Sequence, residues 1–450
     1  MSNILFPAIQ TIADCTPLAE RAMRLMREIY PICRSITGPG VRETFVRIAQ
    51  HIPLSTFEVP SGTSVFDWEV PREWIIRDAY IADSHGRRAV DFRRNNLHVV
   101  GYSAPVNARM TLAELRPYLH SLPEHPDWIP YRTSYYRENW GFCLSHRELE
   151  ALSDDVYEVV IDSELRAGSL SYAEAHVAGE SEQEFLMHTH ICHPSLANDN
   201  ASGIAITTLL AEELAKQQPK LSYRLVFSPG TIGSITWLAR NQHRLPQIRA
   251  GLVIGLVGDS APLTYKRSRR GNAEIDHIAS RVVRDIDVNA RIVDFSPYGY
   301  DERQFCSPGI DLPVGRLTRS SNDGYAEYHT SADNMNLIKS EALAESFLAL
   351  ARILRTVDSN RLLRNLSPLG EPRLGKRGLF RSVGGDAPPQ REHAMLWLLN
   401  QADGLHGLND VSAASNIPVA ILTEAAEALI AAGLLAETTD EPATSVAAKT

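Results

Sequence analysis

The stretch from Phe185 to Lys216 reads FLMHTHICHPSLANDNASGIAITTLLAEELAK. Its first seven residues, 185–191, predict a buried strand, and residues 202–216 predict an amphipathic helix. A polar loop rich in histidine and asparagine joins the two elements. Buried strands that alternate with helices along the chain are typical of a parallel sheet that helices cover on both faces.

The same alternation continues on the C-terminal side. Residues 223–227 and 251–257 predict further strands, and residues 234–243, 273–286 and 340–357 predict helices. On the N-terminal side, residues 17–50 predict two helices, of which the first starts at Pro17 with Thr16 as its cap. The expected fold class is therefore α/β, with a mostly parallel sheet and helices on both faces.

Two further parts of the sequence do not show this alternation of strands and helices. Short β-branched and aromatic runs such as 73–82, 97–102 and 156–161 predict a β-rich inserted domain. Near the C-terminus, a Pro- and Gly-containing linker at 366–375 precedes three short helices at 392–401, 408–415 and 419–432, which suggest a winged helix-turn-helix. The predicted domains are an α/β domain at 1–55 and 166–365, the insert at 56–165, the winged helix at 376–437 and a disordered tail at 438–450.

Composition narrows the choice of partner and compartment. The 450 residues carry a net charge of −9, and the five cysteines are scattered without a CxxC motif. We therefore expect a cytoplasmic protein that has no disulfide framework, membrane span or nucleic-acid partner. Residues 376–437 contain four basic and seven acidic residues, so we expect the winged helix to dock or oligomerise rather than bind DNA.

Histidine and aspartate side chains follow several of the predicted strands. His188, His190 and His193 stand where the first strand ends, and Asp199 precedes the next helix. Asp259 follows the strand at 251–257, and His329 lies in the polar loop before the last long helix. Because the carboxyl ends of parallel strands meet at one edge of the sheet, these residues predict a zinc site there.

Several motifs resemble those of a bacterial and archaeal family of aminopeptidase-like proteins, described in connection with polysaccharide biosynthesis. They are ICHPSLANDNASG, PGTIGS, DERQFCSPGIDLPVG and EYHTSADN, together with RDAYIAD and NNLHVVGYSAPV in the insert. The wider superfamily contains co-catalytic zinc aminopeptidases and glutaminyl cyclases. The resemblance covers nearly the whole chain and includes the insert and the winged helix.

The resemblance implies a set of metal ligands, which are His193, Asp199, Asp259 and His329. His190 is an alternative to His193, because the H-x-D motif of the superfamily has no counterpart after either histidine. The family motif also has a glutamate, the expected general base or ligand, where this chain has Gly230. Glu302 and Glu327 are the carboxylates that could replace it.

The function implied is a zinc-dependent hydrolase that cleaves an amide bond of a small or peptide-like substrate. The alternative is an impaired pseudo-peptidase that binds a ligand or partner, since Gly230 cannot take up a proton. Candidate substrate contacts are Arg316, Arg319, Arg269 and Tyr328, which offer charge-assisted or phenolic hydrogen bonds. The added modules are compatible with a homodimer.

Overall fold

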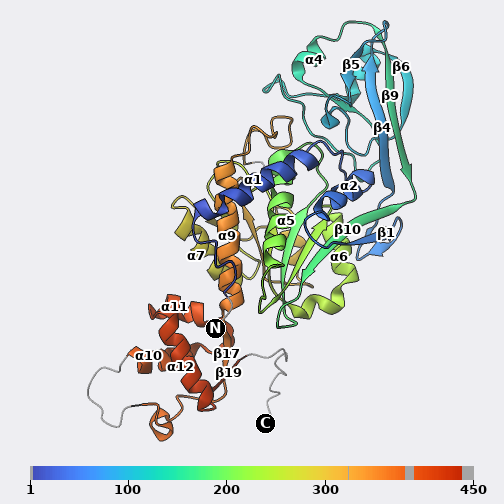
Figure 1. Cartoon of the computed structure of the whole chain (residues 1–450). Coiled ribbons are helices and arrows are strands. Elements are labelled where there is room, and N and C mark those ends of the chain that lie inside the picture. Colours follow the sequence, from blue (N-terminus) through green and yellow to red (C-terminus); the bar gives the residue numbers. More distant parts are fainter. Residues whose placement is uncertain (1–3, 323, 381–389, 438–450) are drawn as a thin grey trace.

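The computed structural model describes residues 4–322, 324–380 and 390–437. Three parts follow one another along the long dimension of the molecule (Figure 1). The α/β part lies in the middle, the β-rich insert lies at the top of the view, and the winged helix lies at the bottom. The predicted tail at 438–450 falls outside the described residues.

The central sheet has eight strands. In spatial order they are β1 (Ser55–Pro60), β10 (Ser169–Val177), β12 (Ser222–Ser228), β11 (Glu184–His190), β13 (Ile248–Ile254), β16 (Val314–Thr318), β14 (Thr264–Lys266) and β15 (Arg291–Val293). Strands β12, β11, β13 and β16 pair in parallel, which confirms the predicted centre of the sheet. Antiparallel pairs flank this centre, at β1–β10–β12 on one side and at β16–β14 on the other.

Helices cover both faces of the sheet, as the fold class requires. The helices against one face are α1 (Ile12–Ile29), α2 (Pro39–Ile48), α5 (Gly203–Leu214), α7 (Glu274–Ile286) and α9 (Ser340–Ser359). Helices α6 (Ile232–Arg240) and α8 (Glu302–Phe305) pack on the other face, where Trp237 and Phe305 are fully buried. The 3-10 segment at Gln242–Gln247 leads from α6 into β13.

Helix α1 starts five residues earlier than predicted. Thr11, rather than Thr16, is the N-cap, and it forms a capping box with Asp14. This reciprocal pair satisfies backbone donors of the first turn, so Pro17 lies inside the helix instead of opening it.

The insert is built around a second, four-stranded antiparallel sheet. Its order is β5 (Arg88–Asp91), β4 (Glu73–Ala82), β9 (Val156–Arg166) and β6 (Val106–Thr111). The predicted strand at 97–102 is wrong: a 3-10 turn, Asn96–His98, stands there, because the Asn95 side chain caps the amide of Leu97. The smaller elements are β2 (Ser64–Val65), β3 (Trp68–Glu69), α3 (Leu112–Leu115), β7 (Leu119–His120), β8 (Phe142–Cys143), α4 (His146–Glu150) and the 3-10 turn Arg116–Tyr118.

The winged helix follows α9 directly. Strand β17 (Leu362–Asn365) is the middle strand of a small sheet, between β18 (Asp403–Gly407) and β19 (Leu435–Glu437). Helices α10 (Gln390–Gln401), α11 (Leu408–Ser415) and α12 (Val419–Ala431) pack on it, and a 3-10 turn occupies Leu374–Arg377. Strand β17 belongs to this sheet, although it precedes residue 376, the predicted start of the winged helix. Among the described residues, no helix is both long and apolar enough to cross a membrane.

A buried ion triad joins three neighbouring strands. Arg224 of β12 contacts Glu174 of β10 and Glu184 of β11, and each of the three residues is at most 7 % exposed. We expect Arg224→Met to lower the free energy of unfolding by about 3–5 kcal/mol, because two carboxylates would remain buried without a cation. Chemical denaturation measures the change.

The matched control is Arg77→Met, which breaks a pair with Asp162 in which both side chains are about half exposed. Solvent screens such a pair, so its loss should leave stability nearly unchanged. Equal effects of the two substitutions would contradict the structural importance of the triad.

Candidate metal centre

The histidines and Asp199 are placed by the end of β11 and the turn that follows it. His190 is the last residue of the strand, and His193 lies three residues further on. Asp199 belongs to the irregular turn Ala197–Ser202, which leads into α5. His190, His193 and Asp199 are all at most 5 % exposed, although each is polar. Polar side chains buried to this degree need partners inside the protein.

Their partners are one another. His190 Nε2 lies 2.7 Å from Asp199 Oδ1, and His193 Nε2 lies 3.8 Å from Asp199 Oδ2. His329 comes from the distant loop before α9, and its Nε2 lies 3.1 Å from Asp199 Oδ2. One carboxylate thus gathers three imidazoles, and the structure places both His190 and His193 in the cluster.

The electrostatics of the cluster favour the forms that bind a metal. Burial lowers the pKa of His193 to about 3 and also lowers that of His190. Burial alone would raise the pKa of Asp199, but the neighbouring imidazoles outweigh it and hold that pKa well below its usual value. Neutral imidazoles and an ionised carboxylate are the deprotonated ligands that zinc requires.

Ligand atoms of His190, His193 and Asp199 all lie within 4.8 Å of one another, a spacing that could hold a single ion. His190 Nδ1, in addition, is buried without a hydrogen-bond partner. The donor set and its spacing therefore fit a zinc ion.

Other buried groups hold this loop in shape. Asp333 accepts hydrogen bonds from the backbone amides of Asn198 and Asp199. Arg34, only 1 % exposed, donates from Nε to the carbonyl oxygen of His193. Because these contacts come from the loop before α9 and from the segment after α1, the cluster depends on three separate regions of the chain.

The insert reaches the cluster through Tyr131. Its backbone amide donates to the carbonyl oxygen of His329 at 2.7 Å. The centre of its ring lies 5.3 Å from that of His193 and 5.1 Å from that of His329. The sequence signalled only a concentration of aromatic residues in the insert, so the position of Tyr131 at the site could not be predicted.

Tyr300 fills the space beside Gly230. A Cβ atom on Gly230 would lie 2.0 Å from Cε1 of Tyr300. The tyrosine hydroxyl donates to the Gly230 carbonyl oxygen at 3.3 Å, and its ring centre lies 4.2 Å from that of His190. Where the resemblance led us to expect a glutamate, this chain therefore has a glycine covered by a phenol from a distant segment.

The two candidate carboxylates have different surroundings. Glu302 is fully buried, accepts a hydrogen bond from Lys266 Nζ at 2.9 Å and also accepts from the amide of Tyr300. Burial opposes its ionisation, but Arg316 and Lys266 still lower its pKa. Glu302 therefore anchors the Tyr300 segment, whereas Glu327 is half-buried on the loop that carries His329.

Asp259 lies near the cluster but outside the group of converging ligand atoms. Its Oδ2 accepts from Asn198 Nδ2 at 2.6 Å, and its Oδ1 accepts from the amide of Ala261 at 2.7 Å. Both oxygens therefore bind the protein's own donors.

Of the four predicted substrate contacts, two lie away from the histidine cluster. Arg319 binds the carbonyl of Ala261 and the carboxylate of Glu345, and Arg269 pairs with Asp311 at the surface. Neither side chain contacts the histidine cluster. Tyr328 stacks on His329, with ring centres 3.9 Å apart, and Arg316 is buried on β16.

Cys192 lies within the cluster as a thiol. Its sulfur is 3.3 Å from His193 Nδ1 and 3.4 Å from the Tyr300 hydroxyl. Burial raises its pKa to about 12, so the thiolate that would act as nucleophile or ligand is disfavoured. Cys192 therefore packs against the site.

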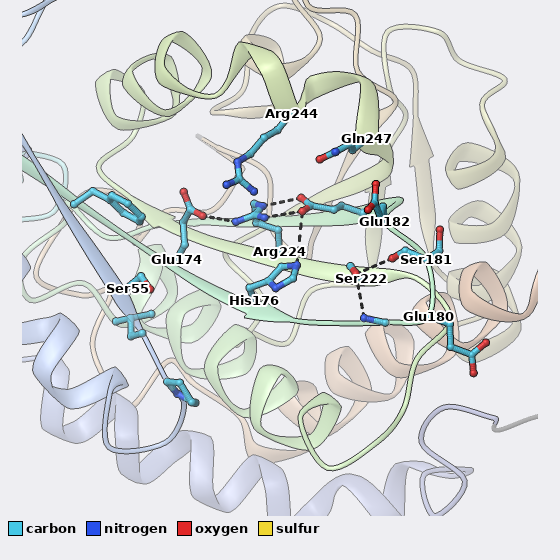
Figure 2. A pocket seen from close by; sticks show the side chains of 15 residues that line it. Ser55, Glu174, His176, Glu180, Ser181, Glu182, Ser222, Arg224, Arg244 and Gln247 are labelled. Carbon is cyan, nitrogen blue, oxygen red and sulfur yellow. Dashed lines mark hydrogen bonds and ion pairs between the residues drawn. The ribbon is translucent and has the colours of Figure 1, made fainter. Parts of the chain in front are cut away.

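A cavity of about 710 Å³ lies at the amino ends of the parallel strands, opposite the histidine cluster. Figure 2 shows the side chains that line it. Its wall includes Arg224, which is flanked by Glu174 and Glu184. The buried charges of this triad are already paired with one another. The histidine cluster lies at the opposite, carboxyl edge of the sheet.

An α/β sheet with this cluster at its carboxyl edge defines an aminopeptidase-like protein. A family model described as "Domain of unknown function (DUF4910)" matches residues 23–360, and a winged helix-turn-helix model matches residues 361–437. The chain therefore belongs to the DUF4910 family. The second match confirms the predicted winged helix.

Two relatives come from Clostridium acetobutylicum. One, described as a polysaccharide biosynthesis protein with an aminopeptidase-like domain, is 50 % identical over 412 residues, which are 91 % of this chain and 95 % of that protein. The other is a crystal structure described as a peptidase. It is 48 % identical, covers 95 % of this chain and 98 % of its own, and has a TM-score of 0.82.

More distant structures share the fold. A zinc aminopeptidase from Bacillus subtilis is 10 % identical and has a TM-score of 0.56, with 75 % of this chain and 95 % of that chain covered. A peptidase M28 precursor from Shewanella amazonensis is 13 % identical and has a TM-score of 0.53, with coverages of 77 % and 96 %. The aminopeptidase-like fold is therefore shown.

Zinc content tests which carboxylate is a ligand. We expect the full chain to retain about one zinc ion after dialysis, and Asp199→Asn to lose it, because Asp199 is the carboxylate on which the imidazoles converge. Asp259→Asn, the matched control, should keep its zinc, since both Asp259 oxygens are used by the protein. Elemental analysis of the dialysed proteins gives the answer, and loss of zinc from both variants would assign Asp259 as a ligand.

Restoring the missing glutamate should require a second change. We expect Gly230→Glu alone to lower stability by about 1–3 kcal/mol, the usual cost of overpacking, because its Cβ would overlap Tyr300. Gly230→Glu combined with Tyr300→Ala should recover stability relative to the single change. Thermal unfolding of the three variants, including Tyr300→Ala alone, is the measurement, and a fully stable Gly230→Glu protein would contradict the packing.

Proposed function

We propose that this chain is a zinc-dependent hydrolase that cleaves an amide bond of a small or peptide-like substrate. The observation that carries the proposal is the convergence of three imidazoles on the Asp199 carboxylate at the carboxyl edge of the sheet. The aminopeptidase-like family supports the reaction class. A cytoplasmic location and a homodimer remain part of the proposal.

The residues that would hold zinc are His190, His193, Asp199 and His329. Catalytic zinc sites usually have three protein ligands and one open position, so four candidates leave one side chain available for another role. His329 is the most accessible of them, with 32 % of its side chain exposed. When bound, zinc would polarise the amide carbonyl and acidify water.

Proton transfer needs a group at the mouth of this cluster. We assign it to Glu327, which is half-buried and lies two residues before His329. Glu302 is committed to Lys266 and to the Tyr300 amide, so it acts as a positioning residue. Burial raises the pKa of Tyr300 well above its usual value and keeps its phenol protonated, so it can donate a hydrogen bond.

Binding without cleavage is the second candidate function. The Tyr300 ring occupies the space of the expected glutamate, and a phenol that stays protonated cannot act as a base. For the winged helix we propose protein docking rather than nucleic-acid binding, supported by the excess of acidic residues in 376–437.

Hydrolysis of a panel of aminoacyl and dipeptide amides separates the two functions. We expect zinc-dependent turnover in the full chain, and a loss of about 10²–10⁴-fold in kcat for Glu327→Gln, the usual range for removal of a general base. Glu341→Gln, an exposed glutamate of α9, is the matched control and should retain full activity. A zinc-loaded chain that binds these amides without cleaving them would establish the second function instead.

A further inference from the structure

Arg316 is a buried cation with one unused edge. It lies on β16 and is 3 % exposed. Its Nη1 donates to Asn322 Oδ1 and lies 4.0 Å from Glu302 Oε1. Its Nε and Nη2, however, are buried without a hydrogen-bond partner among the described residues. Leaving charged donors unpaired in the interior costs stability, and no described residue supplies a hydrogen-bond partner for these two atoms.

Two other arginines of this chain, Arg224 and Arg249, use the same edge to bind a carboxylate. The Nε and Nη2 atoms of Arg224 both contact the Glu184 carboxylate at 2.6 Å. The same two atoms of Arg249 contact the Glu274 carboxylate at 2.9 and 2.6 Å. These two donors point in the same direction and match the two oxygens of a carboxylate. The corresponding edge of Arg316 has the same chemistry, but no carboxylate of the described residues binds it.

Arg316 also faces a cavity. The cavity measures about 220 Å³, and its lining includes Lys266, Ser296, Gly299, Arg316, Ser321 and Asn322. Gly299 has a positive φ of 156°, and a Cβ there would lie 2.7 Å from Lys266 Nζ and overlap the Glu302 carboxylate. The glycine therefore keeps this cavity open beside the two cations.

The cavity is next to the histidine cluster. Arg316 is paired with Val253 of β13, and Val253 is paired with His188 of β11. Because side chains alternate along a strand, His190 lies on the same face as His188 and therefore on the face of Arg316. The segment over this face connects the two sites, since Gly299 lines the cavity and the centre of the Tyr300 ring lies 4.2 Å from that of His190.

Among the described residues, the buried charges at the cavity are positive on balance. Lys266 and Arg316 contribute two cations, and Glu302 offsets one of them. Asp294 also lines the cavity, but its side chain is 85 % exposed and pairs with Arg267. An anionic group entering the cavity would complete the hydrogen bonds of Arg316 and neutralise the remaining charge.

We propose that the Arg316 cavity binds a carboxylate of the substrate, so that the amide cleaved at the histidine cluster belongs to an acidic molecule. The assignment rests on the proposed function, and it names the substrate class: an amide in which a carboxylate lies a short distance from the scissile bond. The small volume of the cavity admits a carboxyl group on a short stem rather than an extended peptide.

Carboxylate binding can be measured in the metal-free full chain, independently of hydrolysis. The probe is glutarate, with glutaramide as its neutral counterpart, followed by isothermal titration calorimetry in the presence of a chelator. We expect glutarate to bind, glutaramide not to bind, and Arg316→Gln to weaken glutarate at least about tenfold, because it removes a charge-assisted pair of hydrogen bonds. Arg316→Lys should weaken it as well, since an ammonium group cannot replace the two-donor edge.

Arg291→Gln is the matched control, since it removes an exposed cation of β15 that does not line the cavity and should leave glutarate affinity unchanged. Ser296→Glu, which would place a carboxylate in the cavity, should block glutarate and covers the case in which Arg316→Gln does not fold. Equal affinity for glutarate and glutaramide, unchanged affinity in a folded Arg316→Gln protein, or tighter binding of phosphate than of glutarate would overturn the proposal. Because no zinc is present, failure of hydrolysis would leave this result intact.

Discussion

The Asp199 carboxylate is the constraint around which the site is organised. A carboxylate that is 1 % exposed is stable only when opposite charge or hydrogen-bond donors surround it. Three imidazoles from two separate segments surround it here, and Asp333 holds the backbone that carries it. The strand β11, the irregular turn and the loop before α9 must therefore all come together before this site exists.

A second constraint is steric and lies on the opposite side of His190. Gly230 and Tyr300 act as one packing unit, because the ring occupies the volume that any larger side chain at position 230 would need. Glu302 then fixes the backbone amide of Tyr300, and Lys266 fixes Glu302. Gly230 and the Tyr300 segment thus form one wall where the resemblance predicts a glutamate. This wall continues into the Arg316 cavity, which Lys266 also lines.

The two added modules relate to the site in different ways. The insert contributes Tyr131, whose backbone and ring both contact the histidine cluster, so it forms part of the wall of the site. The winged helix lies at the C-terminal end of α9, at the opposite end of the molecule from the insert (Figure 1). Its packing helices bury Leu422, Ala425 and Leu429 in its own core.

The sequence alone determined the α/β class, the parallel centre of the sheet and the approximate place of most helices, because hydrophobic periodicity reports which face of an element is buried. It also located His190, His193, Asp199 and His329, since polar residues after apolar strands collect at one edge.

Only the tertiary structure decided that Asp259 is held by Asn198 and Ala261, that Glu302 is paired with Lys266, and that Tyr300 covers Gly230. These outcomes depend on contacts between residues up to 70 positions apart, and local sequence patterns carry no information about which distant side chain fills a given space. The strand expected at 97–102 is a capped turn for a local reason instead: the hydrogen bond from the Leu97 amide to the Asn95 side chain outweighed the β preference of the residues that follow.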